Sequence, residues 1–136
     1  MISHGATEST ETELERINSI SERVIGCAIE VHKQLGPGLL ESVYESALCV
    51  ELELAGLRYQ QQVPVSVSYK GRVVGDLRLD LLVENLVVVE IKSVERSEPV
   101  FEAQVLSYLK LSGKRLGLLI NFNNRLVKTG IQRFIL

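Results

Sequence analysis

Residues 76–92, DLRLDLLVENLVVVEIK, constrain the fold of this chain more than any other stretch. Two runs of strand-forming residues are separated by the polar pair at 84–85, and Asp80, Glu90 and Lys92 interrupt the apolar runs. Charged side chains are seldom buried in a sheet unless they are paired or bind a cation, because removing them from water is unfavourable. The stretch therefore predicts a largely buried hairpin that carries a functional site.

Length and composition indicate one globular domain. The chain has 136 residues, of which 46% are hydrophobic and 24% charged, and this is enough to bury one substantial core. No apolar run of about 18 residues could span a membrane, and the polar, acidic N-terminus does not resemble a signal peptide. We expect a cytoplasmic protein without membrane contact. Cys27 and Cys49 form no CxxC pair, so we expect buried free thiols.

Charge is distributed unevenly along the chain, although the net charge is only −2. Residues 1–53 carry ten acids and three bases, whereas residues 103–136 carry six bases and no acid. We expect these bases to contact nucleic-acid phosphates. They are Lys110, Lys114, Arg115, Arg125, Lys128 and Arg133.

The N-terminal part predicts a tail followed by two helices. Residues 1–12 are rich in Ser, Thr and Glu and predict a disordered tail. Apolar residues then recur every three or four positions over 14–35, which indicates a helix that ends at Gly36-Pro37-Gly38. A second helix is expected over 39–55. Domain organisation is thus a tail over 1–12 and a single domain over 13–136.

The remainder predicts strands and one further helix. We expect strands over 59–69, 72–75, 76–83, 86–93, 116–122 and 126–136, and a helix over 97–111 with Ser97 as its N-cap. This order indicates an α/β fold with a mixed central β-sheet flanked by helices on both faces. The third helix would connect two parallel strands.

The position of Asp80 depends on the turn at 84–85. A plain two-residue turn places Asp80 opposite Val89, with Glu90 on the other face. A three-residue loop over 84–86, or one bulge, places Asp80 directly opposite Glu90. Two opposed carboxylates, about 5 Å apart at Cβ, repel each other unless a cation lies between them.

Such a pair would suit a hard divalent cation. Asp80, Glu90 and the carbonyl of Ile91 could form an oxygen shell of the kind that Mg²⁺ or Mn²⁺ prefers. Lys92 emerges on the same face as Glu90 and could orient water or stabilise charge on a phosphate. The alternative is a plain cross-strand ion pair between lysine and acid.

Asp80, followed by Glu90-Ile91-Lys92 on the next strand, resembles the signature of the PD-(D/E)XK nuclease superfamily. Leu79 stands where the superfamily's name has proline. The resemblance implies a restriction-endonuclease-like core, a magnesium-dependent hydrolase acting on nucleic acid, metal ligands at Asp80 and Glu90, and a catalytic lysine at Lys92.

A second motif strengthens this resemblance. The segment 38–44, GLLESVY, matches the motif that names the GxxExxY protein family, and the similarity extends from Gly26 to about Phe122. Superfamily members often place a helix glutamate in the metal site, a role open to Glu41. Glu41 could instead be a first-turn acid favoured by the helix dipole, and Tyr44 a core residue with a bonded hydroxyl.

Four other side chains have alternative interpretations. Gln104 and Tyr108 lie one turn apart on the third expected helix and resemble a QxxxY pattern that accompanies the site in exonuclease-like members, although such pairs also arise by chance. His32 could contact phosphate or serve packing. Asn121 could be a turn former only.

Two function classes remain from the sequence. The first is a metal-dependent nuclease acting on DNA or RNA, with a homodimer as a possible assembly. The second is a module that keeps the nuclease fold to bind nucleic acid or a protein without catalysis. A nucleotide enzyme with a Gly-rich loop is disfavoured, because neither a P-loop nor GxGxxG occurs.

Overall fold

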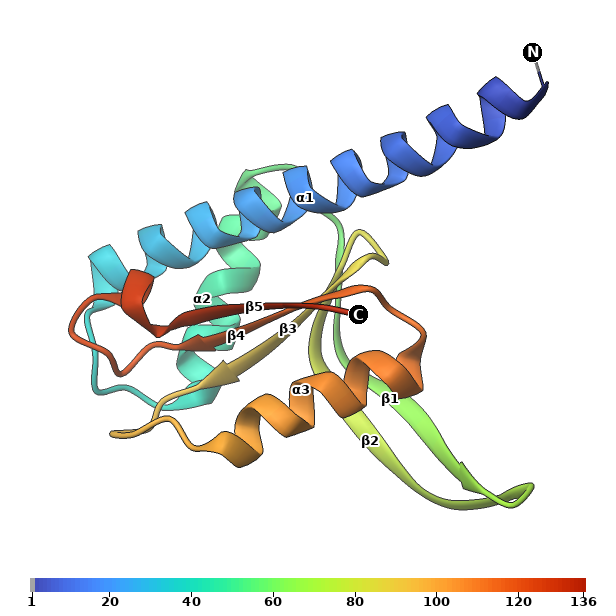
Figure 1. The fold of residues 1–136 in the computed structure, drawn as a ribbon. Helices are drawn as coiled ribbons and strands as arrows, with labels where there is room; N and C mark the ends of the chain where they lie inside the picture. The colour runs from blue at the N-terminus through green and yellow to red at the C-terminus, as the bar shows by residue number, and fades with distance from the viewer. Residues whose placement is uncertain (1) are drawn as a thin grey trace.

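A computed structural model describes residues 2–136, with side chains from residue 12 onward (Figure 1). The predicted disordered tail covers residues 1–12. All of its side chains except that of Thr12 lie outside the described part of the chain, so the tail stays a prediction. The elements are α1 (Ile2–Leu35), α2 (Glu41–Leu54), β1 (Tyr59–Tyr69), β2 (Arg72–Val83), β3 (Val87–Lys92), α3 (Pro99–Ser112), β4 (Leu116–Asn121), the 3₁₀ helix η1 (Val127–Gly130) and β5 (Ile131–Ile135).

The five strands form one mixed sheet in the order β1-β2-β3-β4-β5. β3 and β4 are parallel and are joined through α3, whereas the other neighbours are antiparallel. Helices α1 and α2 cover one face and α3 covers the other, each over its own apolar cluster (Figure 1). The predicted α/β fold with helices on both faces of a mixed sheet is therefore confirmed.

Local periodicity located most of this core. The α1 stripe predicted from the sequence is buried at Ile17, Ile20, Val24, Ala28 and Val31. The middle strands β3 and β4 are buried on both faces, as their continuous apolar runs indicate. Both cysteines are buried and free.

Three expectations about elements were wrong. The segments 72–75 and 76–83 form one long strand, because a single β1 partner pairs along both. Ser97 is not the N-cap of α3, whose N-cap is Glu98 with no side-chain hydrogen bond. Only the second half of 126–136 is a strand; η1 precedes it, and the Thr129 hydroxyl donates to the Leu126 carbonyl at 2.7 Å.

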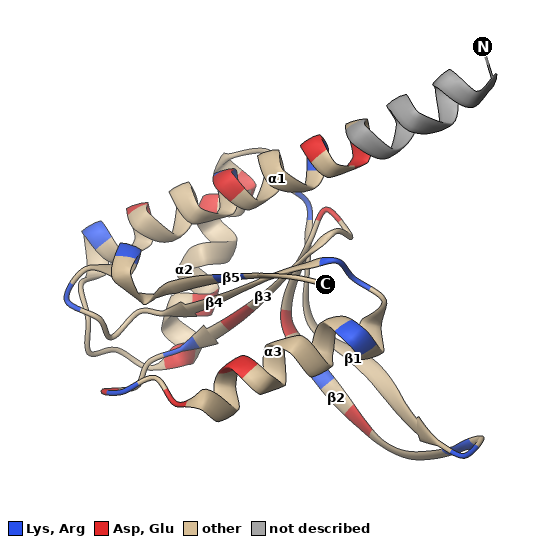
Figure 2. Ribbon diagram, viewed as in Figure 1, with Lys and Arg blue, Asp and Glu red and all other residues tan. Residues whose placement is uncertain are grey.

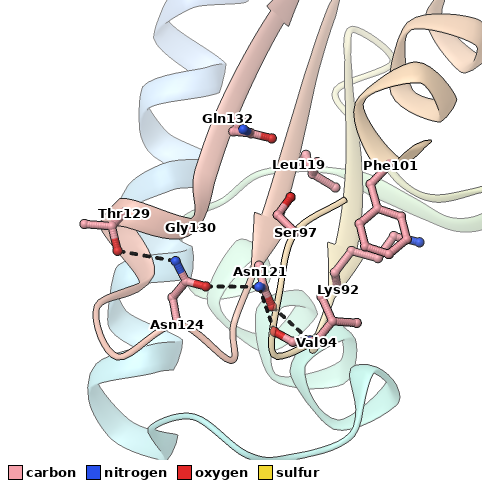
Figure 3. A pocket seen from close by; sticks show the side chains of 10 residues that line it. All are labelled: Lys92, Val94, Ser97, Phe101, Leu119, Asn121, Asn124, Thr129, Gly130 and Gln132. Carbon is pink, nitrogen blue, oxygen red and sulfur yellow. Dashed lines mark hydrogen bonds between the residues drawn. The ribbon is translucent and has the colours of Figure 1, made fainter. Parts of the chain in front are cut away.

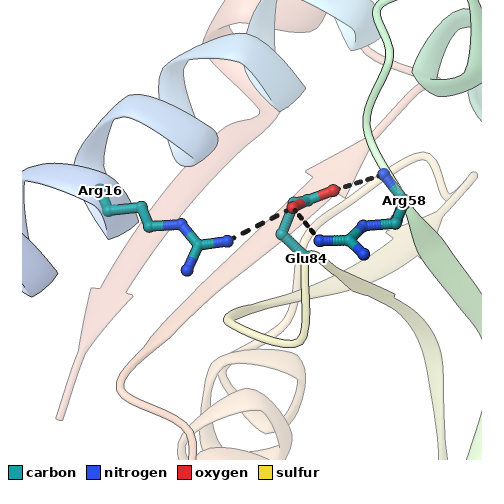
Figure 4. A network of polar contacts seen from close by, with 3 residues as sticks. All are labelled: Arg16, Arg58 and Glu84. Carbon is teal, nitrogen blue, oxygen red and sulfur yellow. Dashed lines mark hydrogen bonds and ion pairs between the residues drawn. The ribbon is translucent and has the colours of Figure 1, made fainter.

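Helix α1 is tied to the β2–β3 turn through Glu84 (Figure 4). The carboxylate of Glu84 accepts a 2.6 Å hydrogen bond from the backbone N–H of Arg58 and pairs with the guanidinium groups of Arg16 and Arg58 at 3.5 and 3.6 Å. The backbone hydrogen bond, followed by the two guanidinium charges, lowers the pKa of Glu84. The network holds the turn that sets the strand register of the candidate site.

Candidate metal and active site

The β2–β3 turn has the form that brings Asp80 opposite Glu90. Leu81 pairs with Val89 and Val83 with Val87, so three residues separate the last paired positions. Glu84 and Asn85 both have positive φ, at 52° and 58°. The three-residue alternative is thus confirmed, and the plain two-residue turn is excluded.

Asp80 and Glu90 come directly after the last paired residues of β2 and β3, Leu81 and Val89. At this position the two strands are joined by hydrogen bonds from the acid side chains. The N–H of Ile91 donates to Oδ2 of Asp80 at 2.8 Å, and the N–H of Asp80 donates to Oε1 of Glu90 at 3.2 Å. Each carboxylate therefore binds the backbone of the opposite strand. The reciprocal bonds hold both acids at the point where β2 and β3 separate.

The strand alternation breaks at Asp80. Leu81 belongs to the apolar cluster beneath α1 and α2, whereas Leu79 belongs to the cluster beneath α3. Residues two apart on a strand normally share a face. Opposite Asp80, Gln62 has a φ of 51°, which is sparsely populated by non-glycine residues and is often found at functional sites. Both strands are therefore distorted at the level of the carboxylates.

Glu90 is a buried acid, with 5% of its surface exposed. Burial, followed by the charge of Asp80, raises its pKa to about 8, although the nearby ammonium of Lys92 acts in the opposite direction. Burial and the charge of Asp80 together hold this carboxyl group protonated near neutral pH. A divalent cation would offset both effects.

Lys92 lies on β3 beside a small cavity (Figure 3). Its Nζ lies 4.7 Å from the centroid of the Phe101 ring, a cation–π contact from α3. In the described part of the chain Lys92 makes no ion pair, so the plain lysine–acid pair is not formed there. The cavity, about 60 Å³ in volume, has room for a few water molecules and is lined partly by Ser97, Thr129 and Gln132.

The carboxyl end of β3 is fixed by Asn121, which is 5% exposed. Its Nδ2 donates to the Val94 carbonyl at 2.9 Å and its Oδ1 accepts from the Val94 N–H at 3.1 Å (Figure 3). Asn121 also accepts from the N–H of Asn123 at 3.2 Å. It is therefore a structural clamp on the segment after Lys92, and more than the turn former considered from the sequence.

Helix α3 carries both residues of the predicted QxxxY pair. Burial, followed by the charges of Glu90 and Asp80, raises the pKa of Tyr108. Gln104, one turn earlier, is exposed and makes no hydrogen bond within the described residues. Roles for Tyr108 and for Gln104 in the site both stay predictions.

Helix α2 contributes an acid that the sequence reasoning missed. Glu45 accepts hydrogen bonds from Nε2 of Gln61 at 3.0 Å and of Gln62 at 2.9 Å, and Gln62 also reaches Oδ1 of Asp80 at 3.5 Å. Burial, and after it the charge of Asp80, raises the pKa of Glu45, although the Gln61 hydrogen bond opposes this. Glu45 is thus linked to the carboxylate pair.

Glu41 lies one turn before Glu45, at the exposed start of α2. Residues four apart share a helix face, so the i, i+4 spacing of the two acids was a signal for Glu45 in the sequence. A role for Glu41 in the metal site stays a prediction.

His32 and Tyr44 have structural partners. His32 Nε2 bonds with the Asn124 carbonyl at 2.8 Å. Tyr44 is fully buried, and its ring stacks on that of Phe122 with 4.6 Å between the ring centroids. Its hydroxyl donates to the Gly36 carbonyl at 2.5 Å. Both fit the packing interpretations.

The acids present fit a cation with few protein ligands. Among the residues whose side chains are described, no group of three His, Cys, Asp or Glu side chains is placed to hold a metal. Mg²⁺ usually keeps several waters and binds through one or two carboxylates. Asp80 and Glu90 supply two carboxylates, which is the number that this requirement needs.

Sequence comparison identifies the family. Residues 18–134 match the family described as the PD-(D/E)XK nuclease superfamily, and the chain belongs to that superfamily. PD-(D/E)XK nucleases generally use divalent metals. No curated protein and no solved structure gives a significant match. In the described residues, no helix has the length and apolar character to cross a bilayer.

Proposed function

We propose that this protein is a Mg²⁺- or Mn²⁺-dependent nuclease that hydrolyses phosphodiester bonds in nucleic acid. The observation that carries the proposal is the reciprocal bonding of Asp80 and Glu90 across β2 and β3, with Lys92 on the same strand as Glu90. Two acids bound to each other's strands, one of them buried, repel each other when both are ionised, and a bound cation would relieve that repulsion.

Asp80, Glu90 and the carbonyl of Ile91 would hold the metal. The ion would supply Lewis-acid polarisation of the phosphate and a lowered pKa for water. Lys92 would place its Nζ against the negative charge that develops on the phosphate, with the Phe101 ring limiting its rotamers. The charges of Glu90 and Asp80 act on the Tyr108 hydroxyl, which would orient water or phosphate.

Cleavage of plasmid, linear and single-stranded substrates in Mg²⁺ and Mn²⁺ tests the proposal. Asp80→Ala and Lys92→Ala should each lower the cleavage rate by about 10²–10⁴-fold, the range for removing a group that acts in the transition state. Lys33→Ala, which changes an exposed lysine on α1, is the matched control and should cleave as the wild type does. Equal rates in all four proteins would indicate a contaminating nuclease.

A catalytically silent nucleic-acid-binding or protein-binding module is the second candidate. Among the described residues, no third His, Cys, Asp or Glu side chain joins Asp80 and Glu90 to hold a metal, and this favours the silent module. Calorimetry with Mn²⁺ separates the two, because the silent module should show no binding at millimolar metal that depends on Asp80.

Several finer assignments belong to the same proposal. The segment 38–44 supports membership of the GxxExxY family. We also propose a single domain over 13–136, and the superfamily match over 18–134 lies within it. A cytoplasmic location and a homodimer are also proposed. Sedimentation analysis of the purified chain would test the dimer.

A further inference from the structure

Strands β1 and β2 continue beyond the rest of the sheet as a two-stranded arm, defined here as residues 63–79. Pairing of β2 with β3 stops at Leu81, whereas pairing of β1 with β2 continues to Tyr69 and Arg72. Figure 1 shows the arm projecting past α3 to a tight turn at Lys70-Gly71. The arm begins beside Asp80, at the edge of the candidate site.

The base and the tip of the arm differ in burial. Near the base, Val63, Val65 and Leu77 pack against the apolar cluster beneath α3. At the tip, Tyr69, Val73 and Val74 are exposed by 61%, 71% and 62%. The tip therefore adds little to the core, and its exposed side chains are available to a partner.

The tip is also basic in a protein of net negative charge. Residues 67–75 contain Lys70 and Arg72 and no acid, and these bases lie at the end of the projecting hairpin (Figure 2). Lys70 Nζ lies 5.4 Å from the centroid of the Tyr69 ring. Positive groups beside an exposed aromatic ring complement a phosphate backbone.

We infer that the arm lies in the major groove of a B-form DNA duplex, and that double-stranded DNA is the substrate class of the proposed nuclease. This inference rests on the proposed function. The major groove of B-DNA, about 12 Å wide, admits a two-stranded β-ribbon. The major groove of A-form RNA is deep and too narrow to be read by side chains, so the arm selects DNA over duplex RNA.

The arm's length sets the amount of duplex that it spans. The eight steps from Asp80 to Arg72 extend about 26 Å at roughly 3.3 Å per residue. B-DNA rises about 3.4 Å per base pair, so the arm follows about eight base pairs on one side of the site. Duplexes trimmed below that length on one side lose the contact with the tip.

Binding of a 20-base-pair duplex in EDTA, followed by fluorescence anisotropy, tests the arm without cleavage. The double variant Lys70→Glu/Arg72→Glu should bind DNA about tenfold or more weakly, with a salt-dependence slope smaller by about two. Arg23→Glu/Lys33→Glu makes the same charge change at exposed positions on α1, on the other face of the sheet from α3, and should retain more affinity. Wild type should prefer the DNA duplex over RNA of the same sequence, and the arm variant should lose that preference.

Three results would overturn the inference: no DNA binding by wild type, equal loss in the arm and control variants, or equal wild-type affinity for RNA and DNA duplexes. Unchanged melting temperatures in the two double variants verify that both are folded. The outcome is separable from the nuclease proposal. DNA binding that depends on the arm, without metal-dependent cleavage, would support the arm inference and contradict the nuclease proposal. Cleavage of duplex DNA by the arm variant at the wild-type rate would support the nuclease proposal and contradict the arm inference.

Discussion

Glu90 shows how a single residue couples the metal site to stability. It is nearly fully buried beside another carboxylate, and burial, followed by the charge of Asp80, raises its pKa to about 8. In the unfolded chain the same group titrates near 4.5. Since the folded pKa is the higher one, the folded state holds an extra proton between these values.

Stability of the metal-free protein should therefore fall as pH rises from about 4.5 and level off above about 8. Glu90→Gln cannot ionise, so it should be more stable than wild type at pH 9 by on the order of a few kcal/mol, at ~1.4 kcal/mol per pKa unit. The same variant should lack metal-dependent cleavage. Thermal unfolding in EDTA at several pH values checks this, and parallel pH profiles for the two proteins would contradict it.

At the scale of elements, the distortion shared by β1 and β2 gives helix α2 access to the carboxylates. Gln62, with its positive φ, reaches both Glu45 and Asp80 through one amide nitrogen. Neither the helix nor the hairpin alone would bring these groups together. The Glu45–Gln62–Asp80 chain is the contact between α2 and the site.

Glu45→Ala should weaken Mn²⁺ binding by about 10- to 100-fold, as expected for loss of a group that orients a metal ligand. We expect Glu45 to act as a positioning residue through Gln62. Glu41→Ala is the matched control, because it removes an exposed acid one turn away. Calorimetry on both variants distinguishes them, and a larger effect for Glu41 would reverse the assignment.

At the scale of the molecule, the six C-terminal bases do not form one face. β3 and β4 are parallel, so the carboxyl end of β4 lies beside Lys92. Arg125 and Lys128 follow that end, whereas Lys114 and Arg115 precede β4 and lie at the opposite end, where Lys114 donates to Asn85. Figure 2 shows basic residues at both ends of the sheet. Although residues 103–136 contain no acid, their six bases therefore do not lie on one surface.

Glu84 joins α1, the segment just before β1 and the β2–β3 turn, so its titration should affect the whole fold. Its pKa is lowered from the ordinary 4.5, so its ionised form contributes stability above that pH, and the contribution is lost as pH falls through the lower folded value. Glu84→Gln should destabilise the protein by about 1 kcal/mol at pH 7. Urea unfolding at pH 7 and pH 4 should show this difference shrinking in acid; a constant difference would exclude the linkage.

The amino-acid sequence by itself determined the fold class, the α1 stripe, the doubly buried strands and the Asp80…Glu90-x-Lys92 motif. Apolar period and turn residues act over a few positions, so they are readable locally. The sequence also narrowed the hairpin to two registers, of which one brings the acids together.

Only the tertiary structure decided which register forms, because Glu84 is held by Arg16 of α1 and by Arg58, just before β1, and both are distant from it in the chain. It also placed Glu45 near Asp80 through Gln62, and made residues 127–130 a 3₁₀ turn where the sequence predicted a strand. Such outcomes depend on contacts between distant segments, which override local propensity. The buried acid pair at Asp80 and Glu90 is a local motif whose geometry required the whole sheet.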